Sequence, residues 1–146
     1  MKSVFETEIN MPQQQLAELF ANPGNNGKWM DDLGSYEPIS GEPGMPGSKY
    51  RLVQKNGNTE MAFIATMTAR NLPYELKLTL EAPNVTVSIT GKFVALAPEK
   101  TRLISEEVFT FSGLLNKIFG FVVQKDIKAA HHRHMESFKR FAENYK

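Results

Sequence analysis

A long amphipathic segment closes the chain, and it follows a stretch that is almost entirely strand-like. Between Leu114 and Tyr145 there is no proline, and apolar residues recur in steps of three and four, which predicts a helix with one buried face. At ~1.5 Å per residue such a helix would be ~45 Å long, the length of a small domain. The strands upstream must therefore wrap around it, and we expect an apolar hollow between the sheet and the helix.

The composition is that of one globular domain. The 146 residues are 41% hydrophobic and 23% charged, which is enough to bury a core without help from metals or disulfides. Cysteine is absent, so disulfides and thiolate sites are excluded. The N-terminus has no apolar leader, and no apolar run is long enough to span a membrane. We therefore expect a cytoplasmic protein, either a monomer or a homodimer.

Turn residues divide the rest of the chain into short elements. An opening strand contains Phe5 to Ile9, a short helix follows Pro12, and a second short helix is expected to hold Trp29, Met30 and Leu33. Six strands are then predicted at residues 36–40, 49–55, 59–70, 74–81, 85–96 and 101–111. Their short connections imply an antiparallel meander. The fold class is α+β: a curved seven-stranded antiparallel sheet around a long C-terminal helix, with two short helices after the first strand.

This order of elements, together with three local features, resembles a known family. The features are the loop Gly41 to Ser48 continuing into KYRLV, Trp29 in the second short helix, and HMESFKRFAEN near the end. The chain resembles, over its whole length, the START-like helix-grip domains of the SRPBCC superfamily, which includes Bet v 1-type pollen proteins and bacterial polyketide cyclase/dehydrase-like proteins. The resemblance implies that residues 1–146 form a single ligand-binding domain with a cavity for a lipid, sterol, quinone or polyketide. Only some members are enzymes.

The predicted cavity is lined by large apolar side chains and a few polar ones. Phenylalanine, leucine and methionine favour an apolar or aromatic ligand, and a few polar groups would orient it. The candidate ligand-binding residues are Trp29, Tyr50, Phe63, Met67, Leu78, Phe93, Glu107, Phe109, Phe119, Val123 and His134.

Two of these candidates carry titratable groups. Glu106 and Glu107 are neighbours on a strand, so only one of them can face inward. Glu107 shares its side with Ser105 and Phe109; it is either an interior acid whose pKa burial would raise or a solvated carboxylate. Helical phase places His134 within the apolar stripe, where it is either a structural histidine or a polar handle for the ligand. An alternative function is a cyclase or dehydratase that uses His134 with Glu107 or Tyr50.

Other chemistry lacks support in the sequence. There is no G-x-S-x-G, H-E-x-x-H or phosphate-binding loop. His131 and His134 are three residues apart on the helix but have no evident third ligand, so we expect no metal and no cofactor. The net charge is +1, so we expect no nucleic-acid partner.

Two surface features leave alternatives open. Lys117, Lys125, Lys128 and Lys139 lie opposite the apolar stripe, forming either a solvated face or a weak contact with an anionic membrane surface or acidic partner. The latter would suit a third function, that of a chaperone regulator or quinone-associated interaction protein. The loop Gly41 to Ser48 is either a shaped connection between strands or a gate over the cavity.

Overall fold

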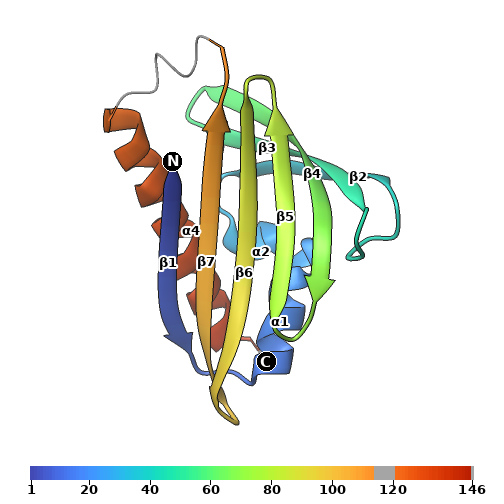
Figure 1. Ribbon diagram of the computed structural model, residues 1–146, viewed down its shortest axis with the longest axis vertical. Coiled ribbons are helices and arrows are strands. Elements are labelled where there is room, and N and C mark those ends of the chain that lie inside the picture. The colour runs from blue at the N-terminus through green and yellow to red at the C-terminus, as the bar shows by residue number, and fades with distance from the viewer. Residues whose placement is uncertain (114–120, 146) are drawn as a thin grey trace.

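The computed structural model describes residues 1–113 and 121–145. Strands form a curved sheet, and one long helix crosses its concave side (Figure 1). The elements in chain order are β1 (Lys2–Ile9), α1 (Gln13–Ala21), the 3-10 turn η1 (Pro23–Asn25), α2 (Asn26–Trp29), β2 (Leu33–Ser40), β3 (Lys49–Asn56), β4 (Thr59–Asn71), β5 (Glu75–Ala82), β6 (Val85–Ala97), β7 (Lys100–Phe111) and α4 (Phe121–Glu143).

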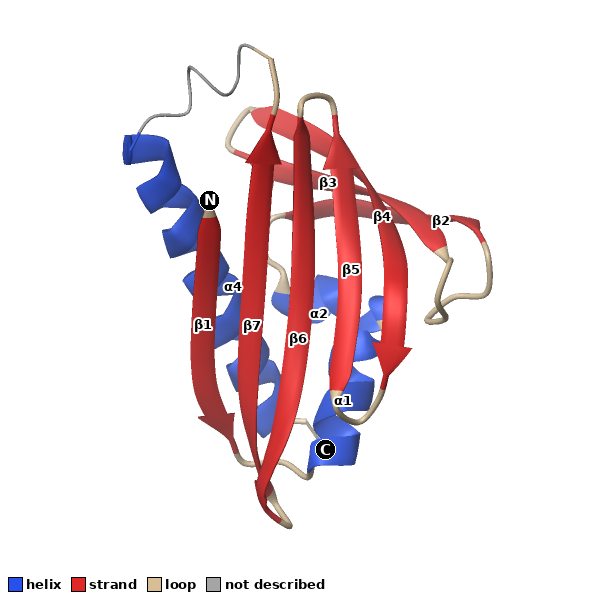
Figure 2. Cartoon of the chain, viewed as in Figure 1, coloured by secondary structure: helices blue, strands red, loops and turns tan. Residues whose placement is uncertain are grey.

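The sheet has seven strands in the order β1-β7-β6-β5-β4-β3-β2, and every neighbouring pair is antiparallel. The meander β2 to β7 follows the chain, and β1 then pairs with β7, for example Phe5 with Ser105. Both short helices and α4 lie on the same side of this sheet, as Figure 2 shows. The predicted fold class is therefore confirmed. Among the described residues, no helix is long and apolar enough to cross a membrane.

The core is richest where α4 meets α1 and α2. Phe138 of α4 is fully buried, and its ring lies 5.1 Å from that of Phe20 and 5.3 Å from that of Trp29 in edge-to-face arrangements. The hydroxyl of Ser137 donates a hydrogen bond to the backbone carbonyl of Trp29 over 2.7 Å. The two short helices are thus fixed to the C-terminal half of α4. A second apolar cluster lies farther along the sheet and contains Tyr50, Leu52, Phe63, Ala65, Val85 and Val87.

One predicted boundary needs correction, and another can be compared only over the described residues. The second short helix ends at Trp29, so Met30 and Leu33 lie outside it; the backbone becomes extended at Met30 and enters β2 at Leu33. The long helix is described from Phe121 to Glu143, about 35 Å at ~1.5 Å per residue. Its predicted beginning at 114–120 lies outside the described residues.

The loop between β2 and β3 is held against β4. Gly41, Gly44 and Gly47 all have positive φ, the conformation that glycine tolerates best. The backbone N–H of Gly47 donates to the carbonyl of Met67 over 2.7 Å, and a guanidinium nitrogen of Arg70 donates to the carbonyl of Gly44 over 2.8 Å. None of residues 41–48 lines the cavity described below. These contacts favour the shaped connection over the gate.

Candidate functional site

A cavity of about 210 Å³ lies between the curved sheet and α4. Its wall is mostly apolar because strand positions of one parity face the helix. The apolar residues that line it come from α1, the segment around α2, five strands and α4. They are Phe20, Ala21, Pro23, Trp29, Met30, Leu52, Phe63, Met67, Leu76, Leu78, Leu80, Val87, Ile89, Phe109, Ile127, Ala130 and Met135.

Most of the predicted ligand-binding residues are on this wall. The structure places there Trp29, Tyr50, Phe63, Met67, Leu78, Glu107, Phe109 and His134. That these residues contact a ligand remains a prediction. Phe119 and the side chain of Val123 lie outside the described residues.

The prediction that Phe93 lines the cavity needs correction, because Phe93 is not part of the cavity wall. Its side chain faces the interior as expected and is almost fully buried. However, Phe20 of α1 packs against it edge to face, with ring centroids 5.6 Å apart. Gly91 makes room for Phe20, since a Cβ there would lie 3.1 Å from the phenylalanine ring. Phe93 therefore belongs to the solid core under α1.

Glu107 carries an acidic group into the cavity. Strand alternation divides the neighbouring glutamates: Glu106 forms a surface ion pair with Lys2 at 3.2 Å, while Glu107 lines the cavity with its side chain only 16% exposed. Burial raises the pKa of Glu107 from 4.5 to about 7, against a smaller lowering effect of the charge on His134. This carboxyl group can therefore hold or release a proton near neutral pH.

His131, beside Glu107, is a site residue that the sequence interpretation considered only as a metal ligand. Its Nδ1 is hydrogen-bonded to Ser3 at 2.7 Å and its Nε2 to Ser105 at 2.9 Å. Burial, with smaller effects from the neighbouring histidines, lowers the pKa of His131 to about 4, so the ring is neutral at pH 7. Its spacing of four and seven residues from Met135 and Phe138, both buried, was the signal that could have placed it inside.

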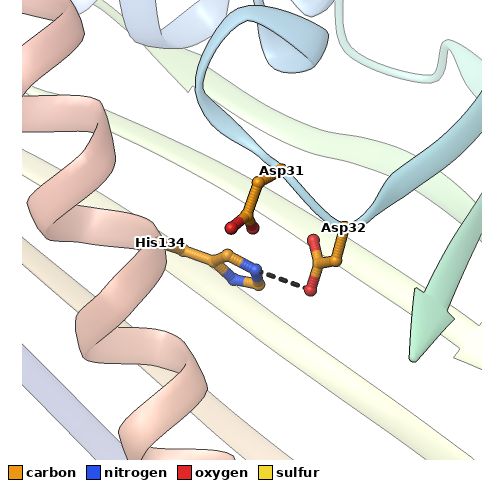
Figure 3. A group of neighbouring side chains, drawn as sticks. All are labelled: Asp31, Asp32 and His134. Carbon is orange, nitrogen blue, oxygen red and sulfur yellow. Dashed lines mark hydrogen bonds and ion pairs between the residues drawn. The ribbon is translucent and has the colours of Figure 1, made fainter. Parts of the chain in front are cut away.

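His134 is buried as predicted, but its partner is Asp32. Its Nε2–H donates a hydrogen bond to Asp32 over 2.8 Å, as Figure 3 shows. The enzyme alternative uses His134 with Glu107 or Tyr50, and all three residues line the cavity. The hydrogen bond of His134 goes to Asp32 because the segment after α2 carries Asp32 to the face of α4. No local pattern indicates this contact, since the two residues are 102 positions apart.

The environment of Asp32 favours its ionised form. Burial by itself would raise the pKa of Asp32, but the hydrogen bond and charge of His134 oppose this. Gln54, which donates a hydrogen bond over 3.1 Å, and Arg133, at 3.6 Å, lower the pKa further, leaving it below its usual value. The ionised carboxylate of Asp32 therefore links α4 to the start of β2 through its hydrogen bond with His134.

The same cluster contains Asp31, whose carboxylate points toward His134 and Asp32 (Figure 3). The candidate ligand atoms of the three residues lie within 4.8 Å of one another. One nitrogen and two oxygen ligands would leave one position of a tetrahedral zinc site to water. However, Asp32 is already hydrogen-bonded to His134, and the Arg133 guanidinium at 3.6 Å supplies a competing positive charge. We therefore interpret Asp32, His134 and Arg133 as a group of ion-paired side chains, with Asp31 beside it.

Tyr50 and Trp29 complete the polar side of the cavity. The Tyr50 hydroxyl is buried, which, together with nearby Tyr36, raises its pKa to about 12 despite a hydrogen bond with Asn26; it is therefore a neutral hydroxyl at pH 7. Trp29 Nε1 and Asp32 Oδ1 are buried and have no hydrogen-bond partner among the described residues. An unpaired buried polar atom costs about 1–3 kcal/mol, so this region retains unused hydrogen-bonding capacity.

Comparison with known proteins identifies the fold. No protein-family model matches the sequence, and no curated protein matches it at a significant level. Among solved structures, a START superfamily protein from Mycobacterium smegmatis has a TM-score of 0.83 at 12% identity, with 99% of each chain covered. A protein from Thermus thermophilus has a TM-score of 0.76 at 16% identity, covering 96% of this chain and 95% of its own.

A plant protein has a similar structure. Major latex-like protein 151 from Panax ginseng matches with a TM-score of 0.76 at 11% identity, with 97% of each chain covered. At these identities the similarity establishes the START/Bet v 1-like helix-grip fold, as predicted from the sequence. Folds of this type commonly bind hydrophobic ligands, whereas function depends on the residues of each cavity.

Proposed function

We propose that residues 1–146 form one ligand-binding domain that takes up a small hydrophobic molecule between the sheet and α4. The observation that carries this proposal is the cavity of about 210 Å³ with an apolar wall. A largely apolar concave site with a few convergent polar groups is typical of small-molecule binding. Glu107, Tyr50 and His134 are the polar groups in this wall on which the proposal draws.

The size of the cavity limits the ligand. Ordinary small-molecule sites measure about 300–1,000 Å³, so a cavity of about 210 Å³ suits a compact molecule. A one- or two-ring quinone or polyketide-like compound fits this limit better than a sterol or a long-chain lipid. Burying ten carbon atoms would contribute about 8 kcal/mol, less the cost of immobilising the ligand, which gives micromolar or weaker affinity.

Binding can be tested with N-phenylnaphthylamine, a neutral fluorophore that brightens in apolar surroundings. We expect it to bind the protein and raise the melting temperature, because a ligand that binds only the native state stabilises that state. Leu78→Trp should fill the cavity and abolish binding. Lys77→Trp is the matched control, since Lys77 is exposed on the next position of β5. Equal binding by the wild type and Leu78→Trp would show that the fluorophore does not use the cavity.

A second candidate function is the cyclase or dehydratase activity, and one observation favours it. The carboxyl group of Glu107 lies in an apolar cavity and titrates with a pKa of about 7, which suits a general base or acid at neutral pH. Its carboxylate would remove a proton from the carbon next to a ketone. Deuterium exchange into α-tetralone in D₂O, followed by NMR, tests this step. The exchange should be catalysed by the wild type and lost in Glu107→Gln; the absence of catalysed exchange would leave the binding function alone.

The interaction-protein alternative has no comparable support in the described part of the chain. The large apolar side chains that are exposed among the described residues come from many different elements, including Val4 of β1, Ile39 of β2, Met61 of β4 and Val94 of β6. Single exposed apolar residues are normal on a protein surface. The cavity therefore remains the feature on which the proposed function rests.

A further inference from the structure

The polar groups around the cavity differ in whether their donor and acceptor atoms already have hydrogen-bond partners within the protein. Both ring nitrogens of His131 are hydrogen-bonded, to Ser3 and Ser105. The Nε2 of His134 is hydrogen-bonded to Asp32. These groups hold the wall together, and a ligand that used the same atoms would have to break an existing bond.

Glu107 differs from these two histidines, because its carboxyl group has no hydrogen-bond partner among the described residues. Trp29 Nε1 is also unpaired, but it is a donor that does not titrate. Its nearest ionisable neighbour, His131 Nε2, is 3.8 Å away, which is too far for a hydrogen bond. That nitrogen is instead bonded to Ser105. The carboxyl group lines the cavity, so it can reach a ligand without giving up a contact.

The surroundings of Glu107 supply no permanent positive charge. The residues opposite it in the neighbouring strands are Ser3 of β1 and Ile89 of β6. From α4 it faces His131 and His134, and from β3 the cavity wall adds Tyr50. Among the described residues that line the cavity there is no lysine or arginine. An anionic ligand such as a fatty-acid carboxylate would therefore be buried beside a carboxyl group without a fixed counter-charge.

We infer that Glu107 recognises the ligand, and that the ligand is a compact, uncharged, mainly apolar molecule whose carbonyl oxygen accepts a hydrogen bond from the carboxyl group of Glu107. This inference rests on the proposed binding function and narrows its ligand class to ketones and quinones. It excludes fatty acids and organic anions. The acid form donates O–H to the carbonyl, whereas the carboxylate can only accept.

The preference for a carbonyl ligand should depend on pH, because only the protonated form of Glu107 donates a hydrogen bond. Burial raises the pKa of Glu107 to about 7, and a bound carbonyl group would stabilise the acid form and raise the pKa further. The preference for a carbonyl ligand over its hydrocarbon analogue should be full below about pH 6 and lost above about pH 8. A positive charge on His134 would lower the pKa of Glu107 and shift this window to lower pH. His131 titrates well below the window.

The test compares three probes of nearly equal shape by displacement of N-phenylnaphthylamine. They are α-tetralone, which has a carbonyl group, tetralin, which has none, and α-aminotetralin, which is a cation at neutral pH. At about pH 6 we expect α-tetralone to bind roughly threefold to tenfold more tightly than tetralin, as one net hydrogen bond predicts. The ratio should approach one at about pH 8, and the amine should not exceed the ketone at about pH 6.

Variants of Glu107 distinguish the effect of its hydrogen-bond donor from the effect of its side-chain shape. Glu107→Gln keeps an N–H donor that does not titrate, so it should retain the preference for α-tetralone at both pH values. Glu107→Met removes the donor and should bring the ratio to about one throughout. Glu106→Gln, on the opposite face of β7 where Glu106 pairs with Lys2, is the control and should behave as the wild type does.

Three results would overturn the inference. Equal binding of α-tetralone and tetralin by the wild type at both pH values would remove Glu107 as the recognition group while leaving the binding function intact. Tighter binding of the amine with rising pH would assign the site to cations. Failure of all three probes and of the fluorophore to bind would overturn the proposed function and this inference together.

Discussion

Glu107→Gln should make the protein more stable at neutral and alkaline pH, although the substitution removes a charged residue from the wild-type sequence. The pKa of Glu107 rises from 4.5 to about 7 when the protein folds. Because the folded state holds this proton more tightly than the unfolded state does, the stabilising effect of protonation is complete below about pH 4.5 and is lost between about pH 4.5 and pH 7. Above about pH 7 the native protein must bury the carboxylate.

The size of this effect on the unfolding free energy follows from the pKa shift of Glu107. A difference of one pKa unit corresponds to 1.36 kcal/mol, so a shift from 4.5 to about 7 amounts to about 3 kcal/mol. The side chain is 16% exposed, so little of this effect is screened by bulk solvent. Glutamine has nearly the shape of the protonated acid and does not ionise. The variant should therefore match the wild type at about pH 4.5 and exceed its unfolding free energy by about 3 kcal/mol at about pH 8.

Urea denaturation followed by circular dichroism at several pH values measures this difference directly. The control is Glu106→Gln, which breaks only a surface ion pair and should change stability by at most about 1 kcal/mol at any pH. Taking the difference between variant and wild type removes the contributions of the histidines, which both proteins share. A difference for Glu107→Gln that does not change with pH would refute the claim that this carboxyl group is buried in the cavity.

Three other results are expected. Phe138→Ala should lower the unfolding free energy by about 3–5 kcal/mol, because the ring is fully buried against Phe20 and Trp29; a loss below about 1 kcal/mol in urea denaturation would contradict this packing. The pKa of His131 is about 4 in the folded protein against 6.5 when free, so its ring should stay neutral in an NMR titration down to about pH 5. The stability that its neutral form contributes at neutral pH should be lost as the pH falls through 4. A titration midpoint near 6.5 would contradict its burial. Added Zn²⁺ should leave the melting temperature unchanged, because His134 and Arg133 already engage the Asp32 carboxylate in the cluster with Asp31. A rise that Asp31→Asn abolishes would reveal a metal site.

The sequence by itself determined the order and type of the elements. These follow from local properties: alternation along strands, the three-and-four spacing of the last helix, and turn residues between them. The same alternation correctly separated Glu107 from Glu106, because neighbours on a strand must face opposite sides. Helical phase likewise placed His134 inside. Each of these predictions concerns residues within one element, where covalent geometry fixes the relation between positions.

Only the tertiary structure decided which of these inward-facing groups meet. Asp32 reaches His134 across 102 positions, and Ser3 reaches His131 across 128. Phe93 faces inward as its strand requires, yet Phe20 of α1 covers it and removes it from the cavity wall. Such contacts depend on how whole elements pack, and packing is set by the shapes of many side chains together. The hydrogen bonds of His131 and His134 join residues from separate elements. Only the tertiary structure therefore shows that these groups are paired, whereas the carboxyl group of Glu107 has no hydrogen-bond partner among the described residues.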